Sequence, residues 1–363
     1  MKKRFALVLV LAMLMSCVPA FAFATDEDGQ GTPAVTEESG QEVAGESGTE
    51  DTIEDGTVID EEPEETAPTY KNEVVTEGGK LVYYNASGAL DMSKGWKRAS
   101  NGTYYSNGSA IVTSPTRIAG TTTVTKKVKY YWNKKKKKWQ TKKKKRAKTK
   151  YKTVKKTVAT NNLYNFGTDG KLITKSGVYT YNGNEYYGLG GGAIKTGWAA
   201  VGDNAMYFYG NGRMAKNTTV GYLKIPANGR LGRAYALGVR KLDSTKWTLK
   251  QAYKNSYKLK YKGRKYRAPN AETYAIRGFT KGYGNCYVMA STFYIQAKLL
   301  GYDVHQVKGK VAHIFPHSWT VIRQGGKEWV YDPNFKNETR RSGWKIWYGK
   351  KGTWRYTNYS KMN

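Results

Sequence analysis

Cys286, His317 and Asp332 are a thiol, an imidazole and a carboxylate that follow one another in the C-terminal part of the chain. A cysteine thiolate can attack an amide carbonyl, a histidine can ionise the thiol and later protonate the leaving amine, and an aspartate can orient the imidazole through its Nδ1–H. The three residues therefore predict a Cys-His-Asp catalytic triad. The backbone N–H of Cys286 is the expected first oxyanion donor, and the sequence assigns no second one.

The element that must position the thiol is a helix. Asn285 is a favourable N-cap, no Gly or Pro interrupts the following run, and Gly301 is a natural stop, which predicts a helix of about fifteen residues. Cys286 lies in its first turn, where free backbone N–H groups favour a thiolate. Apolar residues occur on more than one side of this helix, so we expect a central helix enclosed by other elements.

The other two groups are expected on neighbouring strands, which the pattern predicts at 303–307, 316–323 and 328–332. Gly325-Gly326 turns between the last two. If this turn has an even number of residues, the numbers of any two residues paired across the hairpin add up to 651. Trp319 then lies opposite Asp332. His317 is then the diagonal neighbour of Asp332, about 7–8 Å away and within reach of a side-chain hydrogen bond.

Three short motifs occur in order: Gly284-Asn285-Cys286, His317-Ser318-Trp319 and Val330-Tyr331-Asp332-Pro333. Together they resemble the transglutaminase-like family over roughly residues 242–340. The resemblance implies a papain-like α+β fold and matches Cys286 to the nucleophile, His317 to the base and Asp332 to the third member. Asn285 and Ser318 replace residues that are more frequent in the family, and neither change removes a catalytic group.

The remaining histidines offer alternatives. His313 competes for the base role, and His305 is expected to be structural. A metal site built from these two and His317 is disfavoured, because Pro316 interrupts a helical His-x-x-x-His, so we expect no metal and no cofactor. The acyl acceptor stays open between water, for a peptidase or deamidase, and an amine, for a cross-linking transglutaminase.

The N-terminus has the basic, apolar and small-residue parts of a secretory signal, which predicts a signal peptide at residues 1–24. Cys17 would be lost with it, and Cys286 would be the only cysteine of the mature chain. A lone thiol in an oxidising compartment favours a nucleophile over a small buried hydrophobe. A lipid anchor on Cys17 is the alternative, because Leu14-Met15-Ser16-Cys17 loosely resembles a bacterial lipobox. No membrane span is expected.

Charge is distributed unevenly along the chain. Residues 25–70 form an acidic spacer, in which residues 25–68 hold sixteen Asp and Glu and no Lys or Arg, and we expect it to be disordered. Removing the signal's +3 and the spacer's −16 from the formal +33 leaves +46 on residues 69–363. Such a body attracts polyanions, and for an exported bacterial protein these are wall polymers and anionic lipid surfaces.

Residues 71–240 repeat a short pattern in which an aromatic stretch precedes Gly88–Trp96, Gly170–Gly177 and Gly191–Trp198. The pattern predicts a row of short β-hairpins whose aromatic side chains form one continuous core. It resembles the cell-wall-binding, choline- or glucan-binding repeat families of Gram-positive surface proteins. The resemblance implies wall attachment through aromatic-walled sites, although each aromatic residue could equally be core only.

Residues 126–157 interrupt the repeats with eighteen Lys or Arg and no acid. Alternating Val128, Tyr130 and Trp132 predict a long basic hairpin. For this hairpin, a teichoic-acid-like polymer is the first expected partner and nucleic acid is the second. The alternative is a solvated insertion that binds no particular ligand.

The sequence thus predicts a multidomain protein, with a β-hairpin repeat region followed by an α+β papain-like domain at 241–363. Its predicted function is that of a secreted, cell-wall-associated thiol enzyme. The expected partners are a protein or peptide substrate and a polyanionic or carbohydrate wall polymer; nucleic acid, the second choice for the basic hairpin, is not expected to be a partner of the protein. The alternative, from a different class, is a catalytically silent wall-binding or adhesion protein.

Overall fold

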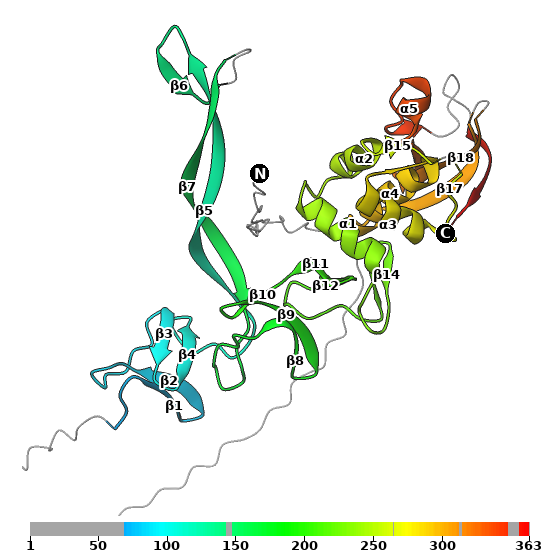
Figure 1. The fold of residues 1–363 in the computed structure, drawn as a ribbon. Helices are drawn as coiled ribbons and strands as arrows, with labels where there is room; N and C mark the ends of the chain where they lie inside the picture. Colours follow the sequence, from blue (N-terminus) through cyan, green and yellow to red (C-terminus); the bar gives the residue numbers. More distant parts are fainter. Residues whose placement is uncertain (1–68, 143–146, 264, 312–313, 348–355, 363) are drawn as a thin grey trace, which may run out of the picture. The chain divides into compact units, whose positions relative to one another are not determined.

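The computed structural model describes residues 69–363 except 143–146, 264, 312–313, 348–355 and 363 (Figure 1). The predicted signal peptide at 1–24, with Cys17, lies outside the described residues, as do the acidic spacer up to residue 68 and His313. Among the residues that are described, no helix is long and apolar enough to cross a membrane.

Short antiparallel hairpins occur along the repeat region, as the pattern predicts. They are β1 (Glu73–Glu77) with β2 (Lys80–Tyr84), β3 (Gly95–Ala99) with β4 (Gly102–Ser106), β8 (Ser176–Tyr181) with β9 (Asn184–Gly190), β11 (Gly197–Val201) with β12 (Asn204–Phe208), and β13 (Thr218–Val220) with β14 (Leu223–Ile225). After several of these strands the chain turns back and forms an isolated antiparallel β-bridge, at Tyr84↔Leu90, Phe166↔Leu172 and Phe208↔Met214. This recurring return is the structural form of the repeat.

The cores of the repeats differ from the prediction of one continuous core. In the described part of the chain most buried side chains of the repeats form separate small clusters, such as those around Tyr104, Tyr186 and Phe208. In the last hairpins, however, Trp198, Leu223 and Ile225 belong to the core of the C-terminal helices. A two-stranded hairpin has few inward-facing positions, so each unit buries only the side chains that the next stretch of chain covers.

The basic insertion forms a long hairpin, which confirms the predicted element. β5 (Thr116–Asn133) pairs with β7 (Thr149–Tyr164) without a break from Thr116↔Tyr164 to Tyr131↔Thr149 (Figure 1). Near its tip β6 (Lys138–Gln140) pairs with β5, and at its base β10 (Ala193–Ile194) joins β7 to β9. The sheet order is β6-β5-β7-β10-β9-β8.

Helices and an antiparallel sheet make up the C-terminal region. The helices are α1 (Arg233–Asp243), α2 (Leu249–Tyr257), α3 (Ala271–Lys281), α4 (Cys286–Leu299) and α5 (Phe335–Thr339). The strands are β15 (Lys260–Tyr261), β16 (Tyr283–Gly284), β17 (Asp303–Val311), β18 (Ile314–Gln324), β19 (Lys327–Tyr331), β20 (Ile346–Trp347) and β21 (Tyr356–Lys361). The main sheet has the order β20-β19-β18-β17-β21. This arrangement is α+β, and the papain-like assignment remains a prediction.

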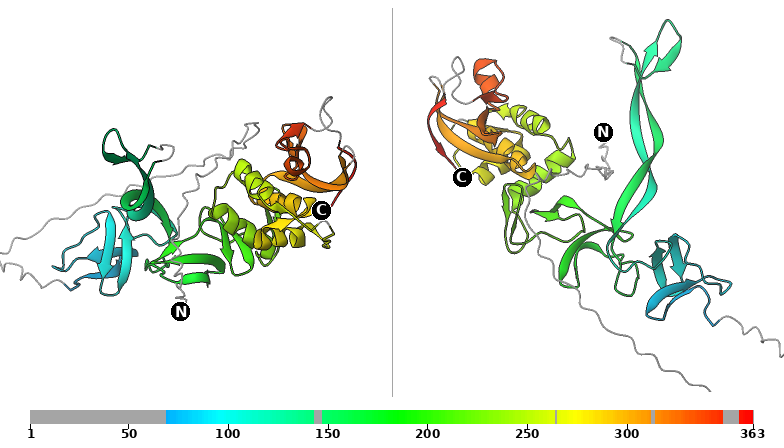
Figure 2. Two further views of the ribbon diagram at one scale, coloured as in Figure 1. Left: turned by 45° about the horizontal axis from the view of Figure 1, so that its top comes forward. Right: turned by 180° about the vertical axis from the view of Figure 1, so that it is seen from behind.

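Helix α4 lies at the centre of this region, as expected from its apolar residues. It packs against α1, α2 and α3 and against strands β17 and β18 (Figure 2). All of its residues except Tyr287 and Lys298 are buried. The predicted limits also hold, because Asn285 caps the helix and Gly301, just beyond it, has a φ of +83°.

The join between the repeats and the C-terminal region runs through α1. Ser244 ends α1, and the side chain of Thr248 caps α2, which begins at Leu249. The predicted division between residues 240 and 241 falls inside α1, whose buried residues share one core with Trp198 of β11 and Phe293 of α4.

Candidate functional site

The thiol of Cys286 lies at the first position of α4. The side chain of Asn285 accepts a hydrogen bond from the backbone N–H of Val288 at 3.2 Å, and its amide donates to the carbonyl of Tyr266 at 2.9 Å. These two bonds fix the entry into the helix. Cys286 is buried, with 6% of its surface exposed, and it is a free cysteine. A thiolate at this place receives the field of the helix N-terminus.

His317 and Asp332 meet through the predicted register of the β18–β19 hairpin. The strands pair from Gln324↔Lys327 to Thr320↔Tyr331, so paired numbers sum to 651. The Nε2 atom of His317 lies 2.7 Å from Oδ2 of Asp332.

Two details of this meeting differ from the prediction. Asp332 comes one residue beyond the last strand pair, because its N–H donates to the carbonyl of Gly343 at 2.8 Å rather than across to Trp319. The ring atom that faces Asp332 is Nε2 and not Nδ1. An aspartate side chain is short, so at a diagonal position the far nitrogen of the ring is the one that reaches it.

The carboxylate of Asp332 is held on both oxygens. Its Oδ1 accepts the backbone N–H groups of Asn334 and Phe335 at 3.0 and 3.1 Å, and Oδ2 accepts the hydroxyl of Tyr356 at 3.2 Å. The residue is fully buried. One oxygen of Asp332 thus stabilises the turn that leads into α5, and the other faces His317.

The electrostatics of the site favour a charged imidazole. Burial lowers the pKa of His317, but the charge and hydrogen bond of Asp332 and those of Cys286 outweigh it, and they raise the pKa to about 10. Cys286 is thus a hydrogen-bonding neighbour of the same ring that Asp332 holds. The structure brings all three predicted residues together. Such a cluster can hold a thiolate beside an imidazolium, the reactive form of a cysteine nucleophile.

A buried polar network ties the helix of Cys286 to the strand of His317. Gln306 of β17 accepts from the hydroxyl of Ser291 of α4 at 2.7 Å and donates to Ser318 of β18 at 3.0 Å. Sequence reasoning missed Gln306, and it missed Tyr356 as well. No sequence spacing predicts a role for either residue, because only the folded sheet brings each of them next to its hydrogen-bond partners.

The other histidines stay apart from this centre or outside the described residues. The Nε2 atom of His305 lies 3.2 Å from Oδ1 of Asp303, and burial lowers the pKa of His305. His313 is not described. Among the described residues no group of three or more His, Cys, Asp or Glu side chains could hold a metal ion.

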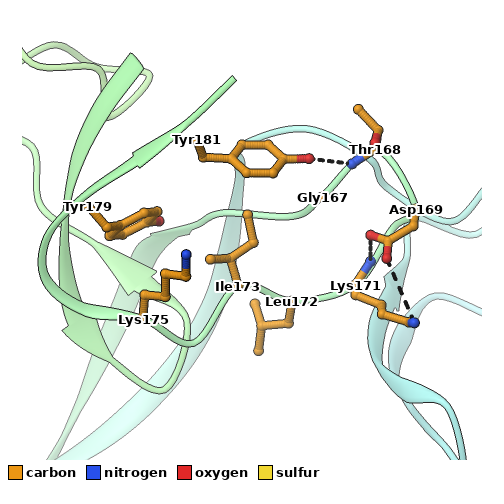
Figure 3. Close-up of a pocket in the computed structure, with 9 residues that line it drawn as sticks. All are labelled: Gly167, Thr168, Asp169, Lys171, Leu172, Ile173, Lys175, Tyr179 and Tyr181. Carbon is orange, nitrogen blue, oxygen red and sulfur yellow. Dashed lines mark hydrogen bonds and ion pairs between the residues drawn. The ribbon is translucent and has the colours of Figure 1, made fainter. Parts of the chain in front are cut away.

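The repeat region contains a hollow of about 450 Å³ beside β8 (Figure 3). The rings of Tyr179 and Tyr181 line it together with the loop before β8, and the ammonium group of Lys175 points between them. The hydroxyl of Tyr181 accepts the backbone N–H of Thr168 at 2.8 Å, so this ring is fixed. Aromatic faces beside polar groups can hold a sugar or an organic cation.

No family model matches the chain, and no curated protein matches it. Among the similar solved structures, choline binding protein F from Streptococcus pneumoniae is 22% identical, with a TM-score of 0.25, over 44% of this chain and 39% of its own. CbpJ from the same species is 24% identical, with a TM-score of 0.18, over 43% and 47%. The modular endolysin of phage Cp-1, complexed with choline, is 19% identical, with a TM-score of 0.17, over 34% and 25%. The chain thus spans about two fifths of the length of choline binding protein F.

Proposed function

We propose that this protein is an exported, wall-associated thiol enzyme in which Cys286 forms an acyl-enzyme from an amide or peptide bond. The observation that carries the proposal is the convergence of Cys286, His317 and Asp332 from three separate elements, with 2.7 Å between the imidazole and the carboxylate. The aromatic hairpins and the basic hairpin support attachment to the wall.

The proposed reaction has two halves. The Cys286 sulfur attacks the carbonyl carbon, the carbon–nitrogen bond breaks, and the proton of the His317 imidazolium passes to the leaving amine. Water or an amine then attacks the thioester, gives its proton to His317, and releases the thiolate. The proposed oxyanion donor for both tetrahedral intermediates is the backbone N–H of Cys286, at the start of α4.

The test is alkylation of Cys286 by iodoacetamide in the native mature chain, where it is the only cysteine. We expect rapid labelling at neutral pH for the wild type and labelling at least about tenfold slower for His317→Ala, because the imidazolium no longer stabilises the thiolate. His305→Ala is the matched control, since it removes an imidazole from the same sheet without touching the cluster, and it should label at the wild-type rate.

Equal rates for wild type and His317→Ala, or labelling of Cys286 only after unfolding, would refute the enzyme. If the thiol is reactive, a screen of peptide amides with and without an added primary amine separates the two acceptors. Release of ammonia without incorporation of the amine indicates hydrolysis, and covalent incorporation indicates cross-linking.

A second candidate function is wall binding without catalysis. The hollow at Tyr179 and Tyr181 favours it, because this site is independent of Cys286. Choline is the first ligand to test, since similar solved structures are named for binding it. Titration of the full mature chain should show saturable binding that Tyr181→Ala abolishes and Tyr222→Ala, an exposed tyrosine elsewhere, leaves intact. The same titration with wall sugars tests the carbohydrate alternative.

A further inference from the structure

The middle of the long hairpin carries one lysine in every cross-strand pair. We call residues 124–130 of β5 and 150–156 of β7 the basic ribbon. Its seven consecutive pairs, from Val124↔Lys156 to Tyr130↔Lys150, each join one lysine to one neutral residue. Directly opposed like charges destabilise a sheet, and this pattern avoids them while it keeps the charge density high.

The lysines of the ribbon form a row on each face. The two residues of a cross-strand pair point to the same side, and successive pairs alternate between sides. One face therefore carries Lys126, Lys150, Lys152 and Lys156, and the other carries Lys127, Lys129 and Lys155. Within a row the charge recurs at every second pair, which is a spacing of about 7 Å along the strands.

The sequence that flanks the ribbon and the described ion pairs supply no counter-charge to it. No Asp or Glu occurs between residues 92 and 168. Within the described ranges, the ion pairs do not include a lysine of the ribbon. As far as the described residues are concerned, both rows are thus open to an external anion.

The second face also offers a surface for an uncharged linker. Tyr151 is 63% exposed, and the Lys129 ammonium group lies 5.5 Å from the centre of its ring. Tyr151, Lys127 and Thr153 line a shallow hollow of about 420 Å³. An exposed ring beside an ammonium group can pack against the carbon atoms that separate two charges of a polymer.

We propose that the basic ribbon binds a linear wall polymer of the phosphodiester type, extended along the strands, with successive phosphodiesters on successive lysines of a row. A lysine is a point charge that suits phosphate oxygens without demanding a fixed geometry, so a regular row suits a flexible chain. The choice of a wall polymer rests on the wall association in the proposed function. The ribbon does not depend on Cys286.

The test measures the affinity of the full mature chain for a purified glycerol-phosphate teichoic acid at several salt concentrations. If one row of four lysines is engaged, log Kd should change with log salt with a slope of about 3, from about 0.7 per contact. Replacing the seven ribbon lysines by Gln should weaken binding more than about tenfold at about 100 mM salt and remove most of that slope. The same seven positions changed to Arg should retain binding, which separates charge from folding.

A matched control changes seven exposed lysines elsewhere to Gln, at Lys80, Lys94, Lys224, Lys241, Lys246, Lys250 and Lys258. This variant loses the same net charge and should bind within about threefold of the wild type. Equal weakening in the two Gln variants would overturn the proposal, because the body charge alone would then account for binding. Tighter binding of a single-stranded oligonucleotide at equal phosphate concentration would also overturn it, in favour of nucleic acid. Iodoacetamide labelling of Cys286 in all variants reports on the proposed enzyme separately.

Discussion

The repeats and the C-terminal region build their interiors differently. Most of the repeats bury small clusters of about four side chains, and only the last hairpins add side chains such as Trp198 and Leu223 to the larger core of the C-terminal helices. The C-terminal region encloses α4 almost completely and buries polar groups such as Gln296, Gln306 and Asp332 in hydrogen-bonded networks.

This difference matches the two tasks that we propose for the protein. A binding surface can be lengthened by repeating a local unit, because each unit needs only its neighbours. A catalytic cluster needs groups from distant parts of the chain within tenths of an ångström, which requires a packed interior with satisfied polar groups. The predictions below test whether the two regions are as separate as their interiors suggest.

The largest effect is expected from Phe293→Ala. Phe293 is fully buried on α4 and its ring lies 5.7 Å from that of Tyr253 and 5.3 Å from that of Tyr331. The free energy of unfolding of α4 should fall by about 3–5 kcal/mol, measured by hydrogen exchange of its amides. Tyr104→Ala, in a small cluster of the repeats, should leave the exchange of α4 unchanged. If Tyr104→Ala reduced the protection of α4 by a similar amount, the two regions would unfold as one cooperative unit.

The next effect is expected from Asp332→Asn. The amide keeps an oxygen for the N–H groups of Asn334 and Phe335 but loses the charge that raises the pKa of His317. The rate of Cys286 alkylation at neutral pH should fall on the order of a hundredfold. Asp303→Asn, beside His305, serves as the control and should alkylate normally. An unchanged alkylation rate in Asp332→Asn would mean that Asp332 only stabilises its turn and that its charge does not act on His317.

The sequence predicted those parts of this site that local chemistry decides. Asn285 and Gly301 set the limits of α4, and Gly325-Gly326 set the register that brings His317 to Asp332, because caps and two-residue turns act over a few residues.

The rest depended on contacts between distant segments. Tyr356 reaches Asp332 from β21, and Gln306 joins α4 to β18 from β17. A tyrosine and a glutamine have many possible partners, and only the finished sheet selects among them. The same reason explains the repeats, where the hairpins could be predicted and the separation of their cores could not.

A smaller effect concerns pH. The folded state raises the pKa of His317 to about 10, so the protonated ring stabilises the fold. This contribution is complete below the ordinary histidine value of about 6.5 and is lost as the pH rises through about 10. A Cys286→Ala background removes the thiol as a second titrating group and also its part in raising the pKa of His317, so the urea midpoint should fall between about pH 6.5 and a pKa below about 10. The double variant with His317→Gln should show a flatter profile, and parallel profiles would exclude His317 as the titrating group.

The smallest effect is expected at a turn of the repeats. Asn182 and Gly183 link β8 to β9 with φ values of +45° and +69°, the left-handed pair that a two-residue hairpin turn requires. A Cβ on Gly183 would meet no atom within 4 Å, so Gly183→Ala tests backbone strain alone. We expect a loss of about 1 kcal/mol in the exchange stability of β9 and no change in Cys286 alkylation. Gly210→Ala is the matched control, because that site is equally open without a positive φ, and it should change little. If Gly183→Ala slowed alkylation, strain in the turn between β8 and β9 would be disturbing the cluster of Cys286, His317 and Asp332, and the repeats would help to support that cluster rather than form an independent surface.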